Sequence, residues 1–178
     1  MGYKIIIDSC GELLEEWKND EHFESVPLTL NVDGETIVDD ASFDQKAFLQ
    51  KVAASTECPK SACPSPERYM KAFDCEADRI YAVTLSAELS GSYNSAVLGR
   101  SLLKEDKPEK KIYVFNSRSA SVGETLIGMK IQECEEAGCT FEEVVSRVEA
   151  YIAEQNTFFV LDNLETLRKN GRLSTVKA

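Results

Sequence analysis

The sequence lacks several features that would point to particular classes of protein. No apolar run in its 178 residues reaches the ~18 residues of a bilayer-spanning helix. The N-terminus has no signal-peptide pattern, because a strand-like run begins at Tyr3. His22 is the only histidine, and none of the six cysteines forms a C-x2-C pair, so a zinc site is not expected. We therefore expect a cytoplasmic protein with reduced cysteines, no metal and no integral membrane association.

Positive charge is also in short supply. The chain has 20 Lys and Arg residues against 31 Asp and Glu residues, which gives a formal net charge of −11. An acidic surface repels nucleic-acid phosphates and anionic lipid head groups, so neither is an expected partner. Hydrophobic residues make up 43% of the chain, which is enough for one soluble domain with a core.

Apolar, strand-like runs alternate with helical patterns along the chain. The predicted strands are 3–7, 26–32, 79–85, 111–115 and 157–161. Three of them lack polar alternation, as expected of strands that are buried on both faces. Asp33 and Gly34 predict a hairpin turn that leads into a further strand at 35–38. We therefore predict an α/β fold with a mainly parallel sheet and helices on both of its faces.

The predicted helices begin at recognisable caps. In three places a Ser or Thr precedes a Glu or Gln by three residues, which predicts capping boxes at Ser42, Ser121 and Thr140. Ser65 followed by a proline is typical of a helix N-cap. The clearest helix is 141–154, with apolar residues at helical spacing, and Gly138 is expected to end the helix before it.

The segment 60–66 carries the first candidate ligand-binding groups. We expect a polar loop that runs into a helix N-terminus, where Ser61 and Ser65 supply hydroxyls and the helix supplies free backbone N–H groups. In a plainer interpretation, Ser65 is only a cap and Ser61 is only part of the loop.

The turn that follows the strand 79–85 is richer in hydroxyls. It carries Ser86 and Ser90 beside Gly91, which would let a ligand approach the backbone closely. In open α/β sheets, ligands bind at the carboxyl ends of strands, where such turns meet helix N-termini. Serines are also common there as plain caps. A catalytic triad is not expected, because no G-x-S-x-G string occurs and His22 lies in a polar, acidic stretch.

Three further segments are candidates for the same chemistry. Ser119 lies in a polar turn, 116–123, again between a strand and a helix, and Asp8 and Ser9 follow the first strand. Arg172 comes after an Asn-Gly turn, from which it could direct a guanidinium at a carboxylate or a phosphate. The alternative for this arginine is a solvated basic helix end.

Taken in this order, these five segments resemble the DegV family. The family pattern is similar to a strand ending in D-S, then K-T-S-Q-P-S, S-S-x-L-S-G-T-Y-x-S-A, D-S-x-x-x-S-x-G and L-x-K-G-G-R. The matching stretches are 8–9, 60–65, 86–96, 116–123 and 167–172, among which L-S-G at 89–91 is the most specific. The chain departs from the pattern at Ser61, Ala62, Cys63, Asn116 and Asn170.

The resemblance implies a DegV-like N-terminal α/β domain over 1–163, with 164–178 beginning the connection to a C-terminal domain that this chain largely lacks. It implies a lipid-binding protein rather than an enzyme: one that binds a long-chain fatty acid, has no other cofactor, and presents the acyl group to a fatty-acid kinase. By the motif matches, Ser61 and Ser90 would hold the carboxylate. The expected fatty-acid site as a whole is Ser61, Ser86, Ser90, Gly91 and Ser119, and Arg172 would assist phosphoryl transfer.

Two other hypotheses stay open from the residues alone. A small serine-dependent phosphotransferase or hydrolase would use a serine at a strand end, although no base accompanies those serines and no Walker loop is present. A regulatory interaction domain would have an empty cleft. Turnover of generic ester and phosphate substrates tests the first of these, and a search for bound lipid tests the second. We also expect this chain alone to fold but to bind fatty acid weakly, because the site would lack its opposite wall.

Overall fold

The computed structural model describes residues 2–158, 160–161 and 164, and within them a four-stranded parallel sheet forms the central layer. Its strand order is β2-β1-β6-β7. The strands are β1 (Tyr3–Asp8), β2 (Phe23–Val26), β6 (Arg79–Thr84) and β7 (Lys111–Asn116). The central strands β1 and β6 are pure apolar runs over most of their length because both faces of the sheet are covered.

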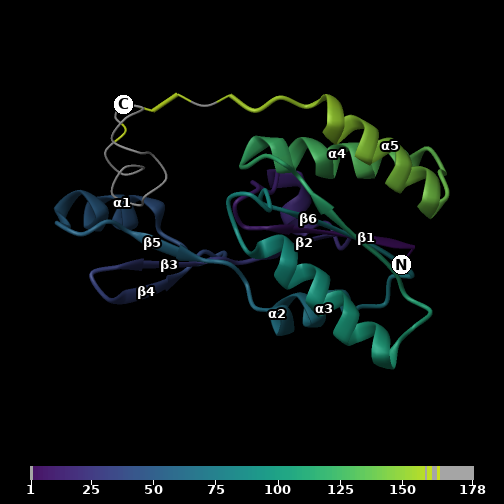
Figure 1. The fold of residues 1–178 in the computed structure, drawn as a ribbon, viewed down its shortest axis with the longest axis horizontal. Coiled ribbons are helices and arrows are strands. Elements are labelled where there is room, and N and C mark those ends of the chain that lie inside the picture. The colour runs from purple at the N-terminus through teal and green to yellow at the C-terminus, as the bar shows by residue number, and fades with distance from the viewer. Residues whose placement is uncertain (1, 159, 162–163, 165–178) are drawn as a thin grey trace.

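Helices pack on both faces of this sheet, as the sequence predicts. One face carries α2 (Pro66–Phe73) and α3 (Ser92–Asp106), and the other carries α4 (Val122–Glu136) and α5 (Phe141–Glu154), as Figure 1 shows. Alternate residues of β1 enter the two cores: Ile6 packs on the α2–α3 side, and Ile5 and Ile7 on the α4–α5 side. The short 3-10 helix η1 (Glu15–Asn19) adds the buried Trp17 to the second core.

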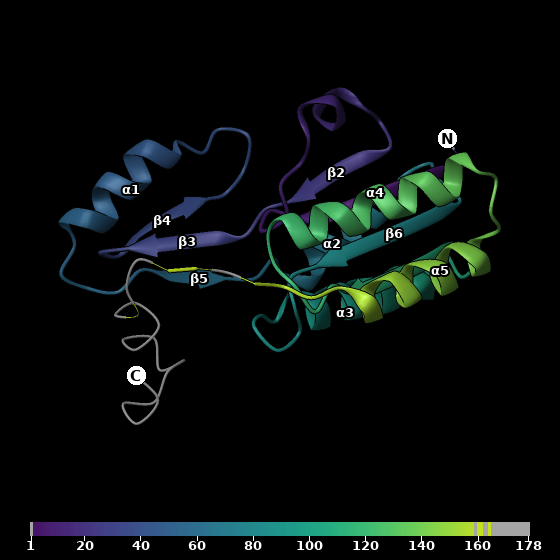
Figure 2. The ribbon, with the colours of Figure 1, turned by 90° about the horizontal axis from the view of Figure 1, so that it is seen from above.

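A small antiparallel sheet extends from the main body, and Figure 2 shows α1 (Gln45–Ala54) lying beside it. Its order is β4-β3-β5, from β3 (Thr29–Val32), β4 (Glu35–Val38) and β5 (Lys60–Ala62). The predicted hairpin is confirmed: Asp33 and Gly34 have φ values of 50° and 80°, as a tight two-residue turn requires. The strands of the main sheet point their carboxyl ends toward this small sheet (Figures 1 and 2).

The structure corrects two strand predictions and one loop prediction. The run 26–32 is not one strand: Val26 ends β2 of the main sheet and Thr29–Val32 form β3 of the small sheet, because Pro27 has no N–H to donate and the chain leaves the main sheet there. The segment 60–66 begins as strand β5 rather than as a loop, with Lys60–Ala62 paired to β3. The described residues of the run 157–161 form no strand and are exposed.

The helix caps are partly as predicted. Thr140 and Glu143 form the expected capping box, Ser65 caps α2, and Gly138 has the left-handed conformation of a helix end. The box at Ser42 is wrong, because Asp44 caps α1 through the Ala47 N–H.

The box at Ser121 is also wrong. Ser121 has a φ of 53° and makes no side-chain cap, and its expected partner, Glu124, is buried. None of the described helices combines the length and the apolarity needed to span a bilayer.

Candidate functional site

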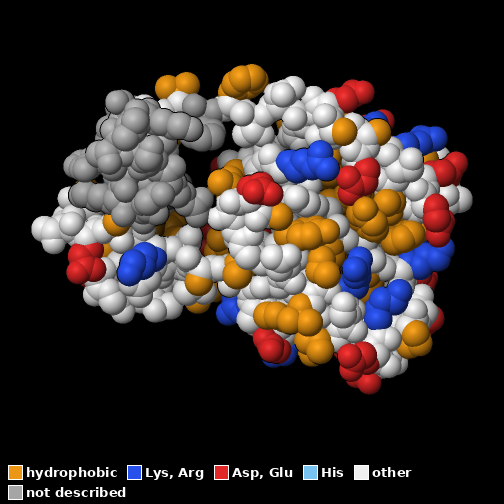
Figure 3. Space-filling model, viewed as in Figure 1, with side chains coloured by type: hydrophobic (Ala, Val, Ile, Leu, Met, Phe, Trp, Pro, Cys, Tyr) orange, Lys and Arg blue, Asp and Glu red, His pale blue; other side chains and the backbone are white. Residues whose placement is uncertain are grey.

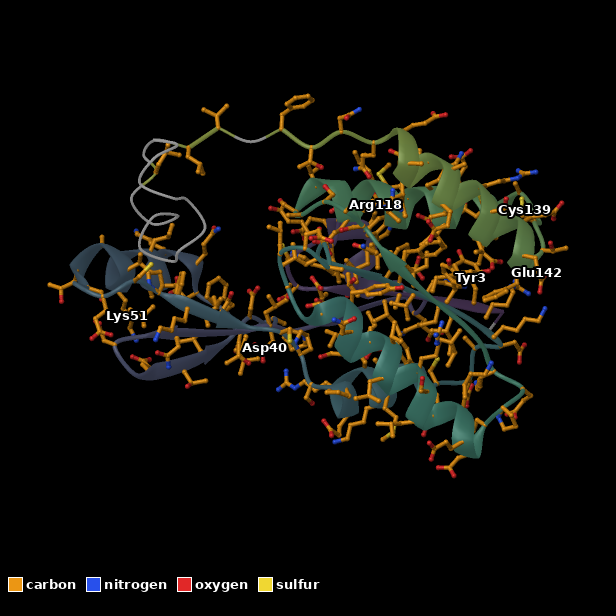
Figure 4. The ribbon with its side chains drawn as sticks, viewed as in Figure 1. Tyr3, Asp40, Lys51, Arg118, Cys139 and Glu142 are labelled. Atoms are coloured by element: carbon orange, nitrogen blue, oxygen red, sulfur yellow. The ribbon has the colours of Figure 1, made fainter. Side chains whose placement is uncertain are left out.

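The candidate site lies at the carboxyl edge of the main sheet. Because β1, β6 and β7 are parallel, the polar residues that follow them meet at one edge. Figure 4 places Asp40 at the junction between this side and the small sheet, whereas Tyr3, Cys139 and Glu142 lie at the opposite end of the main sheet. The segments 8–9, 86–92 and 116–119 therefore share one location, although they are far apart in sequence.

Ser86 and Ser119 are joined directly at this edge. The backbone N–H of Ser86, after β6, donates to the carbonyl of Ser119, after β7, at 2.9 Å. Asn116 Oδ1 supports the same join by accepting from the Ala87 N–H at 3.0 Å. Both serines are buried, so they help to hold the two turns together as well as supplying hydroxyls to the edge. Ser119 Oγ also lies 2.6 Å from Thr157 Oγ1, which ties the segment after α5 to this turn.

Ser90 and Gly91 form the entry to α3. Ser90 is half-buried, and its Oγ accepts from the backbone N–H of Ser92 at 3.2 Å and donates to the Ser92 hydroxyl at 3.2 Å. Gly91, the N-cap of α3, has no side chain and is exposed. Helix α3 begins at Ser92. Its first N–H groups, with the positive end of the helix dipole, favour an anion beside Ser90.

Ser61 lies in the small sheet, on the strand whose end comes close to this edge. It is exposed at the centre of β5, and two residues later Cys63 Sγ lies 3.7 Å from the Ser95 hydroxyl in the first turn of α3. A Cβ at Gly91 would lie 3.0 Å from that sulfur. The end of β5 therefore passes close to the start of α3, so both predicted head-group serines lie on segments that meet there.

Two groups at this edge are missing from the sequence-based prediction of the site. Glu124, in the first turn of α4, has 0% of its surface exposed and lies behind the end of β1, near Asp8. Ser92 is also fully buried, at the start of α3. Glu124 precedes the buried Ile127 and Ile131 by three and seven residues, so helical spacing alone places it on the core face.

The acids at this edge are held away from water. Burial raises the pKa of the Asp8 carboxyl, although hydrogen bonds from the Leu85 N–H and the Ser92 hydroxyl oppose the shift. Burial, followed by the charge of Asp8, raises the pKa of Glu124 to about 10. Neither acid can act as an exposed base for a serine nucleophile.

The histidine that a catalytic triad would need lies away from this edge. The His22 ring packs against the ring of Tyr3 in a tilted arrangement, with 4.4 Å between the centroids, at the opposite end of the sheet, so this only histidine of the sequence does not accompany the strand-end serines. Arg172 lies outside the described residues, and of 164–178 only Leu164 is described. Arg118, in the turn before α4, is exposed (Figure 4).

These features define a class of protein: a parallel α/β domain whose strand ends carry hydroxyls and helix N–H groups, with no histidine among the residues described there. Comparison with known proteins gives the family. The DegV family model matches residues 3–178, and the chain belongs to that family.

The relatives agree with this assignment. A DegV domain-containing protein of Streptococcus pneumoniae is 42% identical over 176 residues, which cover 98% of this chain and 62% of that protein. A DegV family protein of Ruminococcus gnavus, refined with vaccenic acid, superposes with a TM-score of 0.94 at 62% identity, covering 97% of this chain and 62% of that one. The Streptococcus pneumoniae fatty acid kinase B3 protein, loaded with linoleic acid, superposes with a TM-score of 0.90 at 41% identity, covering 99% and 63%. The chain thus spans about 62% of the length of the relatives that it matches.

Proposed function

We propose that the protein represented by this chain binds a long-chain fatty acid and holds its carboxylate at the carboxyl edge of the main sheet. The proposed site consists of Ser61, Ser86, Ser90, Gly91 and Ser119. The observation that carries the proposal is the convergence of β5, the Ser86–Ser92 turn and the Ser119 turn at one edge, with hydroxyl and N–H donors. Fatty acids in related structures of the same fold support it.

The physical chemistry of a fatty acid suits this division between head and tail. Burying the tail contributes roughly 0.8 kcal/mol per CH2, or ~11 kcal/mol gross for a C16 chain before entropic losses. The carboxylate costs several kcal/mol to desolvate unless its oxygens are hydrogen-bonded. Neutral hydroxyls and N–H groups can bind it while leaving an oxygen available for reaction. The head-group site then determines the orientation of the bound fatty acid more than the affinity of the protein for it.

The further role is that of an acyl carrier for a fatty-acid kinase, without catalysis of its own. Its support is the related Streptococcus pneumoniae protein, which is a fatty acid kinase B3 protein carrying linoleic acid. In this proposal, residues 1–163 form the N-terminal domain and 164–178 begin the connection to a second domain. Arg172 assists phosphoryl transfer to the bound acyl group. The protein needs no cofactor other than its lipid ligand, and it acts in the cytoplasm.

Native mass spectrometry of the full-length protein, purified from cells, tests the proposal. We expect one fatty acid per protein, lost on denaturation and replaced by added oleate. A protein that carries no lipid and takes up none would contradict fatty-acid binding. The same preparation, assayed with generic ester and phosphate substrates, tests the serine-dependent phosphotransferase or hydrolase alternative, and we expect no turnover.

A further inference from the structure

Two buried carboxyl groups lie together directly behind the strand-end serines. Asp8 ends β1, Glu124 lies in the first turn of α4, and 0% of either residue is exposed. Carboxylate oxygens of the two acids and the sulfur of Cys10 all lie within 4.8 Å of one another. Two negative charges buried at this separation, without a cation, are strongly unfavourable.

The two acids differ in their partners. Asp8 accepts from the backbone N–H groups of Leu85, at 2.9 Å, and Cys10, at 3.2 Å. Among the described residues, neither oxygen of Glu124 has a donor in hydrogen-bonding geometry, although the Cys10 thiol and the Ser121 N–H are close enough to oppose the rise of its pKa. Asp8 is therefore the natural partner of Glu124, and two carboxyl groups can form a hydrogen bond only through a proton.

Among the residues that the structure describes, none near Glu124 supplies a compensating positive charge. Within this part of the chain, the titratable groups that face Glu124 are Asp8 from β1, Cys10 from the turn after β1, and Tyr69 from α2, whose buried hydroxyl has no hydrogen-bond partner there. All three are neutral or negative in every protonation state. Burial and then the charge of Glu124 raise the pKa of the Cys10 thiol to about 12, so this thiol stays protonated at neutral pH.

We propose that Asp8 and Glu124 share one proton, which Glu124 donates, and that this pair positions the Leu85–Ser86 turn of the head-group site. The protonated Glu124 keeps Asp8 singly charged and oriented, and Asp8 in turn holds the Leu85 N–H. The same proton prevents a second negative charge from forming behind a bound carboxylate. The positioning role rests on the proposed function, whereas the shared proton does not.

Infrared spectroscopy of the full-length protein tests the shared proton directly. We expect the carbonyl band of a buried, protonated carboxylic acid at neutral pH in the wild type, and its loss in Glu124→Gln. The amide keeps the shape and the donor of the protonated acid, so the variant should fold. Failure of Glu124→Gln to fold, or persistence of the band in this variant, would contradict the proposal.

The pH dependence of unfolding gives an independent test. The pKa of Glu124 is raised from 4.5 to about 10 on folding, so between these values the folded state binds one more proton than the unfolded state. Stability from this group is therefore fully present below the lower value and is lost as the pH rises toward the upper one. Relative to Glu124→Gln, the unfolding constant of the wild type should rise about tenfold per pH unit, or about 100-fold from pH 6 to pH 8. Parallel pH profiles would overturn the proposal.

Glu135 offers a matched control on the same helix. It is also buried, but it accepts hydrogen bonds from Arg79 Nε at 2.9 Å, from Arg79 Nη2 at 2.7 Å, and from the Tyr81 hydroxyl. Glu135→Gln should therefore destabilise the protein while leaving the acid band and the lipid affinity unchanged. If Glu135→Gln removes the band instead, the shared proton is assigned to the wrong acid.

The positioning role is tested by fatty-acid binding. Glu124→Ala should weaken oleate binding about tenfold, the cost of one lost hydrogen bond in the frame of the site, and Glu124→Gln should restore it. Equal affinities for wild type and Glu124→Ala would contradict positioning. If the wild type binds stoichiometric metal and Glu124→Gln binds none, a cation rather than a shared proton joins the two acids, and the proposal is wrong. A full-length protein that binds no fatty acid would refute the proposed function and the positioning role, while the spectra and the pH profiles would still decide the shared proton.

Discussion

At the scale of single residues, Ser90 is the most direct test of the head-group assignment. Its half-buried hydroxyl lies beside the start of α3, and among the described residues it is hydrogen-bonded to Ser92. We predict that Ser90→Ala in the full-length protein lowers fatty-acid affinity by about 1–3 kcal/mol, because a charged acceptor loses a donor. Calorimetric titration measures this, and Ser90→Thr should recover most of the loss.

The control for Ser90→Ala is stability, because the Ser90 hydroxyl also accepts from the Ser92 N–H at the helix entry. Denaturant unfolding should show a cost of about 1 kcal/mol or less, as for a weak cap. If Ser90→Ala and Ser61→Ala both leave the affinity unchanged, the carboxylate binds elsewhere.

Gly123 marks a second residue-scale constraint, the close approach of α4 to the Ser119 turn. A Cβ at this position would collide with Ser119 Oγ and would lie 2.7 Å from Ser119 Cβ. We predict that Gly123→Ala destabilises the protein by about 1–3 kcal/mol, as overpacking does. Thermal and urea unfolding check this, with Met129→Ala, on the exposed face of the same helix, as a control that should change stability by less than about 0.5 kcal/mol.

The residues of the site could be predicted only in part from the sequence. Ser86, Ser90 and Ser119 follow strands, so parallel topology alone brings them to one edge. Two patterns compete at Glu124: its distance from Ser121 predicts a capping box, whereas its spacing from Ile127 and Ile131 predicts a core position, and in the structure the side chain is buried. A local motif describes what a side chain can do near its own backbone, and tertiary burial decides whether it does so.

At the scale of elements, the two similar capping patterns on α4 and α5 should respond differently to mutation. Thr140 makes a full capping box, with its Oγ1 accepting from Glu143 N–H at 3.3 Å, whereas Ser121 makes no side-chain cap. We predict that Thr140→Ala costs about 1 kcal/mol of unfolding free energy and that Ser121→Ala changes it by less than about 0.5 kcal/mol. Equal losses in chemical denaturation would show that the two caps are equivalent in solution.

Three strands of the main sheet, β1, β6 and β7, are predictable as apolar runs, as expected of buried parallel strands, whereas of β2 only Val26 lies in a predicted strand. The small sheet is only partly predictable from the sequence. Its hairpin has an Asp-Gly turn, but β5 (Lys60–Ala62) is three exposed residues without an apolar pattern. It is a strand because it pairs with β3, about 30 residues earlier in the chain. Such distant pairing produces no periodic pattern in the sequence of β5 itself. The run 26–32 shows the opposite case. Its apolar pattern continues across Pro27, although the strand does not.

At the scale of the whole molecule, stability should be concentrated in the main sheet. Helix α1 has no buried residue, and the small sheet buries little beyond Val32, whereas β1 and β6 are almost fully buried. We predict that backbone amides of the small sheet exchange with deuterium through low-energy local openings, far faster than those of β1 and β6. Hydrogen exchange followed by mass spectrometry checks this, and equal protection of the two sheets would contradict it.

The surface of the molecule carries apolar side chains on the described residues after α5, and Figure 3 shows such side chains along this segment. Phe158 is 91% exposed and Val160 is 98% exposed. Exposed apolar residues of this size are commonly covered by a partner surface or another part of a protein. The matched relatives are longer than this chain, which spans about 62% of their length, so experiments on lipid binding belong to the full-length protein.

The central claim is that a fatty-acid carboxylate binds at the carboxyl edge of the main sheet, beside Ser90. A crystal structure of the full-length protein loaded with oleate tests it most directly. The account predicts a carboxylate oxygen within about 3.2 Å of Ser90 Oγ, with the Ser61 hydroxyl as a second neighbour. A carboxylate bound away from both serines, with the edge occupied only by solvent, would contradict the account.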